Sequence, residues 1–205
     1  MRVKRLILFA GPSCSGKTTF FRQLAREGAS PLREELGLGD VSEWTYLNRR
    51  KLTLATEPCL ERVILHYDLS ARFLGRQLTD DSLVRLFEAA DELVVITFWA
   101  RPEVLAQRIE GKRRLWRTRL LWPRLLRRAL WKRQKFRDLD QIYSQPSRLT
   151  SCYDEWIAFS SAFPAKAHWI VDTSAQPLEL HPVTHWTTLR ASAAAQRLEA
   201  QGVRD

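Results

Sequence analysis

The stretch from Gly11 to Thr18 constrains the fold of this chain more than any other part of the sequence. It reads Gly-Pro-Ser-Cys-Ser-Gly-Lys-Thr and matches the pattern G-x-x-x-x-G-K-[S/T] at every fixed position. In a loop of this pattern, backbone N–H groups surround phosphate oxygens, and the glycines let the backbone approach them closely. An apolar run at residues 6–10 precedes the motif, and a helical pattern at residues 19–25 follows it. The sequence therefore predicts a phosphate-binding loop between a buried strand and a helix.

Each part of this loop has an expected role in binding a nucleotide triphosphate. Lys17 is expected to reach the β- and γ-phosphates, and the Thr18 hydroxyl is placed to ligate Mg²⁺. The helix that begins near Lys17 points its positive end at the anion. The residues expected to bind the cofactor around Lys17 and Thr18 are Gly11, Ser13, Cys14, Ser15, Gly16 and Thr19. ATP and Mg²⁺ are the expected cofactors.

Length and composition favour one cytoplasmic domain. A chain of 205 residues can bury one sizeable core, so residues 1–205 are expected to form a single domain. The three cysteines show neither paired spacing nor metal-site spacing, which suits a reducing compartment. The apolar run near the N-terminus is too short for a secretory signal, and no run approaches the roughly 20 apolar residues of a spanning helix. Any membrane contact is therefore expected to be peripheral, and the net charge of +10 indicates an anionic partner.

A second candidate site residue is Asp68, which ends the β-branched apolar run at residues 62–68. Such a run predicts a buried parallel strand, and its last residue lies at the sheet edge that also carries the phosphate loop. Asp68 is thus expected to bind Mg²⁺ or to activate a substrate hydroxyl. The alternative is that Asp68 caps a helix at residues 69–74. The strand expected at residues 93–99 lacks a terminal acid. After the last parallel strand, residues 172–174 could form a turn or could line the nucleotide site, and for Asp172 the turn is favoured.

The alternation of strand and helix patterns predicts an α/β fold, with a parallel sheet covered by helices on both faces. This expected arrangement resembles the three layers of P-loop NTPases. Residues 44–47 and 52–56 are both candidate strands, and one of them is expected to be an outer strand of the sheet. The last strand is expected at residues 168–171. Helices are expected at residues 69–74, 82–90, from Pro102 onward and at 190–201, with a short helical turn at 33–36 and a loop at 176–186.

The most unusual stretch is residues 111–137, which carries twelve Lys or Arg and no acid, interleaved with Leu and Trp. Around Pro123 the pattern becomes helical, with apolar residues on one side and arginines on the other. It could form a lid over ATP, an interfacial helix on anionic lipid, a nucleic-acid surface with stacking tryptophans, or a solvated helical hairpin that packs on the domain. Leu is as prominent as Trp, which favours lipid over nucleic acid because stacking does not require Leu. Residues 111–148 are therefore expected to form a basic lid or helical insertion.

The chain resembles the small nucleoside-monophosphate-kinase-like P-loop kinases, the group of adenylate, gluconate and shikimate kinases, over residues 3–175. Beyond the phosphate loop, residues 99–105 and 108–113 look like the strand, helix and R-I-x-G-R-R entry to the lid of adenylate kinases, with Lys112 in place of the first lid arginine. Arg137 and Arg148 are spaced like two family arginines that grip phosphates. The resemblance implies that Arg113 binds nucleotide and that Arg137 and Arg148 clamp the transferring phosphoryl group. The alternative is that these are ordinary members of an arginine-rich region.

The sequence departs from adenylate kinases between residues 28 and 62, where it lacks the Thr-Gly pair and the arginine that hold a monophosphate. AMP is therefore not supported as the acceptor. The expected function is a Mg-ATP-dependent phosphotransferase that acts on a hydroxyl of a small molecule or glycolipid head group. In that function Asp68 orients or deprotonates the hydroxyl, while Lys17, Thr18 and the lid arginines stabilise charge. The alternatives are a nucleotide-gated peripheral membrane or regulatory NTPase and a nucleic-acid end kinase.

Overall fold

The computed structural model describes residues 2–26, 31–38, 44–48, 59–70, 81–118, 126–175 and 177–202. One sheet of six strands, in the order β2-β3-β1-β4-β5-β6, organises this part of the chain. The strands are β1 (Arg2–Gly11), β2 (Thr45–Asn48), β3 (Cys59–Asp68), β4 (Ala90–Trp99), β5 (Ala167–Asp172) and β6 (Glu179–Pro182). The first five strands of this order are parallel, and β6 pairs antiparallel with β5. The predicted α/β fold with a mostly parallel sheet is confirmed.

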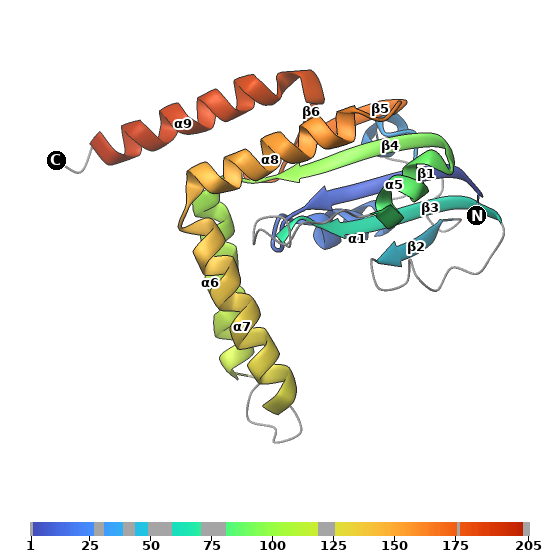
Figure 1. Ribbon diagram of the computed structural model, residues 1–205. Helices are drawn as coiled ribbons and strands as arrows, with labels where there is room; N and C mark the ends of the chain where they lie inside the picture. The colour runs from blue at the N-terminus through green and yellow to red at the C-terminus, as the bar shows by residue number, and fades with distance from the viewer. Residues whose placement is uncertain are drawn as a thin grey trace.

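Both faces of the sheet are buried, because the central strands are apolar at consecutive positions. In β1, Leu6 and Leu8 belong to one core cluster, while Ile7 and Phe9 belong to the other. This is the period of two that a strand imposes on its side chains. The first cluster includes residues of α5 (Asp81–Glu88) and α8 (Pro146–Ser161), and the second includes residues of α1 (Lys17–Arg26). Helices therefore cover the sheet on both sides, as predicted (Figure 1).

Two long helices, α6 (Pro102–Thr118) and α7 (Leu126–Tyr143), run side by side and extend away from the sheet (Figure 1). We call this pair the hairpin. Its base is fixed because Ile109 of α6 and Leu139 and Ile142 of α7 are buried in the first core cluster. The basic stretch at residues 111–137 is thus helical in both of its described parts, 111–118 and 126–137. Residues 119–125, which include Trp122 and Pro123, lie outside the described residues.

The prediction of a loop at residues 176–186 is wrong. Residues 179–182 form β6, and the short helix η3 (Val183–His185) follows. Strand β6 pairs with the outer edge of β5, with Leu180 opposite Val171, and so provides hydrogen-bond partners for the backbone of β5. The Leu180 side chain packs against the second core cluster. Residues 178–182 alternate apolar and polar side chains, but a stretch of this length does not distinguish a strand from a loop, so the pairing with β5 decides the element.

Two helices differ from the sequence expectation. Helix α8 was not predicted, although Leu149, Tyr153 and Trp156 are buried at helical spacing on its inner face. Helix α9 (Trp186–Gly202) begins earlier than expected, because Trp186 packs against Tyr153 and Trp99.

Short helix α2 (Pro31–Glu35) lies near the expected turn, and β2 confirms the outer strand. The strand expected at 52–56 and most of the helix expected at 69–74 lie outside the described residues. Within the described chain, every helix is too short or too polar to cross a membrane.

Candidate functional site

The loop from Gly11 to Thr18 connects the end of β1 to the start of α1. Glycine is required at position 11, because a Cβ atom there would lie 2.7 Å from Ser15 Oγ and 2.8 Å from the carbonyl oxygen of Phe98. Gly16 has a φ of 94° and Cys14 a φ of 73°. This left-handed conformation costs a residue with a side chain about 1–2 kcal/mol. Strain of this kind persists where the surroundings hold the backbone, often at binding sites.

Lys17 points back into the loop. Its side chain is buried, and Nζ donates to the carbonyl oxygen of Gly11, to that of Pro12 at 2.7 Å and to Ser15 Oγ at 3.3 Å. These are weaker acceptors than an anionic oxygen, because charge-assisted hydrogen bonds are about twice as strong as neutral ones. An anion at the loop would therefore compete well for this ammonium group. The side chains of Thr18 and Thr19 are exposed at the start of α1.

Asp68 lies beside the loop at the carboxyl end of β3, where it pairs in register with Gly11 of β1. Its Oδ2 accepts a hydrogen bond of 2.8 Å from Ser13 Oγ, and its Oδ1 accepts one of 3.0 Å from the backbone N–H of Ser70. Ser70 Oγ in turn accepts from the backbone N–H of Ser13 at 2.9 Å. The predicted position of Asp68 beside the loop is confirmed. The contact with Ser70 is of the kind that a capping residue makes, but the helix that Asp68 would cap lies mostly outside the described residues. One carboxylate therefore serves both the turn after β3 and the loop.

Tyr143, at the end of α7, is a site residue that sequence reasoning missed. Its hydroxyl donates to the carbonyl oxygen of Ser13. Burial above all, and then the nearby Cys14, Tyr153 and Asp68, raise the pKa of the Tyr143 phenol well above its ordinary value. The hydroxyl thus stays protonated and can donate at any physiological pH. The only sequence signal for this residue is an aromatic side chain at the end of a basic helix.

Arg108 of α6 was also missed as a site residue, although it belongs to the stretch that resembles adenylate kinases. Its Nη1 donates to Thr173 Oγ1 at 2.9 Å and lies 3.4 Å from the carbonyl oxygen of Cys14, while Nη2 donates to the carbonyl oxygen of Thr173. Thr173 is buried, with its Oγ1 within 3.0 Å of the Ser15 carbonyl oxygen and its methyl group near Gly16. The hairpin therefore brings one guanidinium group to the loop.

The three arginines expected to bind phosphate are placed differently. Arg113 forms ion pairs with Glu110 at 3.0 Å and with Asp140, so in this structure it joins α6 to α7. Arg137 and Arg148 are exposed, and neither makes a hydrogen bond or ion pair with a described residue. The structure thus does not bring these three into contact with the loop, and their predicted roles stay predictions. Asp172 Oδ1 accepts from the backbone N–H of Ser174 at 2.7 Å, which confirms the predicted turn.

The donor set at the loop fits Mg²⁺ better than a transition metal. Mg²⁺ is usually bound by one or two protein oxygens together with phosphate oxygens and water. Thr18 and Asp68 offer oxygens of this kind, a hydroxyl and a carboxylate. The described residues contain no cluster of three or more His, Cys, Asp or Glu side chains that could bind a metal by itself. Mg²⁺ held by Thr18 and Asp68 would take its remaining ligands from phosphate oxygens and water.

No protein-family model matches the chain, and none of the curated proteins matches it.

Proposed function

We propose that this protein is a P-loop kinase of the nucleoside-monophosphate-kinase-like type. It transfers the γ-phosphoryl group of Mg-ATP to a hydroxyl of a small molecule or glycolipid head group. The observation that carries the proposal is the Gly11–Thr18 loop at the end of β1 with a carboxylate from the neighbouring strand, Asp68, hydrogen-bonded to it. Phosphoryl transfer needs positioning and charge stabilisation more than covalent chemistry. A cationic loop beside an acid at one sheet edge suits both needs.

The loop residues fit a triphosphate. The loop and β4 lie so close together at Gly11 that a side chain would not fit there, and Gly16 turns the backbone with a positive φ. Backbone N–H groups and the start of α1 then face the phosphates. Lys17 would exchange its neutral acceptors at Gly11 and Pro12 for phosphate oxygens, and Thr18 would ligate Mg²⁺. Bound Mg²⁺ would neutralise charge that develops between the β- and γ-phosphates.

Asp68 is the proposed residue that orients or deprotonates the acceptor hydroxyl. Its Oδ1 is held by a backbone N–H, which fixes the plane of the carboxylate. Its Oδ2 is bonded to the Ser13 hydroxyl, a group that rotates freely and can turn to another acceptor. A substrate hydroxyl could then donate to Oδ2 in place of Ser13. General base catalysis of this kind contributes about 10²–10⁴-fold to a rate.

Removal of the loop lysine tests the proposal. Calorimetry of the wild-type protein should show ATP binding that requires Mg²⁺, and Lys17→Ala should lose this binding and ATP turnover while it still unfolds in one cooperative thermal transition. Lys166→Ala is the matched control, because Lys166 is exposed and pairs with Glu92 at the opposite end of β4. Equal ATP affinity in the wild type and Lys17→Ala would exclude a P-loop nucleotide site.

A second candidate function, a nucleotide-gated peripheral membrane protein, is favoured by the charge of the hairpin. The hairpin arms beyond Glu110 on α6 and before Asp138 on α7 carry basic side chains and no acid. These are Lys112, Arg113, Arg114 and Arg117 on α6, and Arg127, Arg128, Lys132, Arg133, Lys135 and Arg137 on α7. Leu115, among them, has 63% of its surface exposed. Basic residues with an exposed apolar side chain suit an anionic lipid surface.

A further inference from the structure

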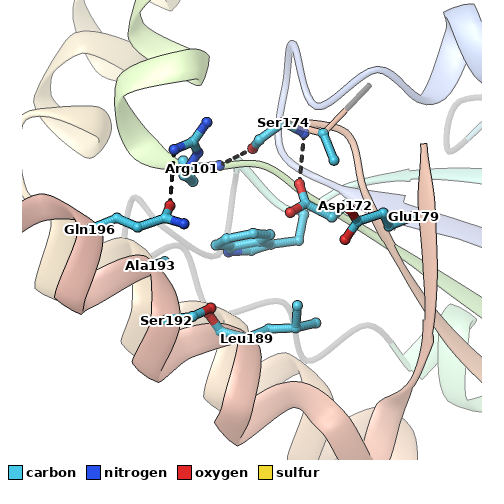
Figure 2. A pocket seen from close by; sticks show the side chains of 10 residues that line it. Arg101, Asp172, Ser174, Glu179, Leu189, Ser192, Ala193 and Gln196 are labelled. Carbon is cyan, nitrogen blue, oxygen red and sulfur yellow. Dashed lines mark hydrogen bonds between the residues drawn. The ribbon is translucent and has the colours of Figure 1, made fainter. Parts of the chain in front are cut away.

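A half-open cavity of about 210 Å³ lies between α9 and the carboxyl ends of β4 and β5 (Figure 2). Its apolar part comes from Trp99 at the end of β4 and from Leu189 and Ala193 on α9. Its polar part comes from Arg101, Asp172, Ser174, Glu179, Ser192 and Gln196. Small side chains on α9, Ser192 and Ala193, leave this space open beside the sheet. No role in the proposed kinase reaction uses this cavity.

Opposite charges face each other across the cavity without pairing. Figure 2 shows Arg101 and Gln196 on one side and Asp172 and Glu179 on the other. The Arg101 Nη1 donates to Gln196 Oε1 at 3.0 Å, and no hydrogen bond or ion pair joins the guanidinium to a carboxylate of the described residues. A guanidinium has five N–H donors, so most of the donors of Arg101 remain for a ligand.

The carboxylates on the opposite side also keep acceptor capacity. Asp172 is only 9% exposed, and the hydrogen bond from Ser174 occupies one of its oxygens. Glu179 has one oxygen 3.2 Å from His181 Nε2 and points its carboxylate toward the cavity (Figure 2). A carboxylate can accept about four hydrogen bonds, so both groups can bind a cation. The cavity thus offers donors at one side, acceptors at the other and an aromatic side chain, Trp99, in its lining.

We propose that this cavity binds a small zwitterion of the amino-acid class. The carboxylate of the ligand would accept from Arg101, its ammonium group would donate to Asp172 and Glu179, and its carbon chain would lie against Trp99 and Leu189. A ligand with a single charge would leave one side of the cavity unpaired and desolvated, which lowers affinity. The volume suits a small molecule, since an engineered protein cavity of about 150 Å³ takes up benzene.

The cavity is separate from the phosphate loop. Asp172 and Ser174 line the cavity, whereas Thr173 between them turns its side chain to Ser15 and Gly16 of the loop. Successive residues thus serve two sites on opposite sides of one backbone segment. The zwitterion site therefore lies on the other side of this segment from the phosphate loop and does not depend on the proposed kinase function.

The test uses ligand-observed NMR and calorimetry on the full chain with glycine, β-alanine, γ-aminobutyrate and ε-aminocaproate. Because these zwitterions differ in chain length, the best binder reports the separation of the two charged sides. Butyrate and butylamine are the matched probes that lack one charge of γ-aminobutyrate. We expect at least one zwitterion to bind in the millimolar range or tighter, and its single-charge analogues to bind at least tenfold more weakly.

Two variants locate the site. Arg101→Gln should weaken zwitterion binding at least tenfold, and Glu179→Gln should weaken it by a similar factor. Arg22→Gln on α1 and Glu155→Gln on α8 are the controls, because they make the same charge changes at exposed positions away from the cavity. Both should leave the affinity for the zwitterion unchanged. The proposal is overturned if no zwitterion binds in the millimolar range, if butyrate or butylamine binds equally well, or if both cavity variants bind like the wild type. It is also overturned if Lys17→Ala abolishes zwitterion binding, since the probe would then occupy the phosphate loop.

Discussion

Asp68 shows how one side chain can serve two purposes at an element boundary. Its two oxygens accept from the backbone N–H of Ser70 and from the Ser13 hydroxyl, so the same residue ends β3 and contacts the loop. Either contact alone would explain an aspartate at this position. Accepting a hydrogen bond from Ser70 requires only an oxygen atom, whereas the proposed catalytic role requires a carboxylate that can take up a proton. A variant that keeps the shape of the side chain but removes its charge can therefore separate the two roles.

Asp68→Asn should lower ATP turnover by about 10²–10⁴-fold, the range for loss of a general base, while ATP affinity changes little. The amide oxygen can still accept from Ser70, so the fold should be retained. Turnover would be measured with γ-labelled ATP, with Asp91→Asn as the control because Asp91 pairs with Arg2 on the exposed amino-terminal side of the sheet. Turnover at the wild-type rate in Asp68→Asn would mean that the carboxylate is only a cap.

His168 of β5 makes stability depend on pH. Burial lowers the pKa of the His168 imidazole to about 4, against an ordinary value of 6.5, and Nε2 lies 3.2 Å from Thr97 Oγ1. The unfolded chain therefore binds the proton more tightly than the folded one. Stability should be complete above pH 6.5 and should fall as the pH drops toward about 4, by about 2 kcal/mol for this partly buried ring.

Urea unfolding at a series of pH values would measure this loss. In His168→Gln the decline between neutral and mildly acidic pH should be shallower than in the wild type, because the amide does not titrate. His185→Gln is the control, since His185 is exposed in η3. An unchanged slope in His168→Gln would show that other groups cause the acid sensitivity.

At the scale of elements, both helices of the hairpin contact the loop at their base. Arg108 of α6 reaches Thr173 and the Cys14 carbonyl oxygen, and Tyr143 of α7 donates to the Ser13 carbonyl oxygen. Ile109 and Ile142 beside them are buried in the core. The position of the hairpin base and the shape of the loop are therefore connected through two backbone carbonyl groups.

Tyr143→Phe should weaken ATP binding as well as stability, because the Ser13 carbonyl oxygen loses its donor and the loop loses one restraint. A hydrogen bond of this kind contributes about 1 kcal/mol to stability. Tyr153→Phe is the matched control: its buried hydroxyl donates to the Phe98 carbonyl oxygen at 2.9 Å, in the core. Calorimetry should show weaker ATP binding only in Tyr143→Phe. If both variants bind ATP like the wild type, the contact serves folding alone.

At the scale of the whole molecule, basic charge is concentrated on a part that extends from the sheet (Figure 1). On the body of the protein, several exposed basic residues pair with acids, as Lys4 does with Glu61 and Arg190 with Asp154. On the hairpin arms the nearest acids, Glu110, Asp138 and Asp140, lie toward the base. An anionic surface would therefore be attracted to the arms rather than to the rest of the protein.

The protein should sediment with vesicles that contain anionic lipid and not with neutral vesicles, and added salt should release it. Lys112 and Arg114 are exposed on α6, and their replacement together by Gln should weaken vesicle binding roughly thirtyfold, from about 1 kcal/mol each. The same double change at Arg22 and Arg26 of α1 is the control. Tight oligonucleotide binding at physiological salt without vesicle binding would replace the lipid partner with nucleic acid.

The sequence by itself determined the features that depend on short stretches. The glycine spacing of the loop, the apolar strands β1, β3 and β4, and the acid at the end of β3 each follow from residues that lie close together in the chain. Asp68 could be placed because parallel strands deliver their carboxyl ends to one edge. Tertiary structure alone decided the contacts between distant residues. Tyr143 meets Ser13 across 130 positions, Arg113 turns to Asp140 instead of the loop, and β6 exists because β5 offers it an edge. These contacts depend on how helices and strands are oriented against one another, and a local pattern of residues holds no information about that orientation.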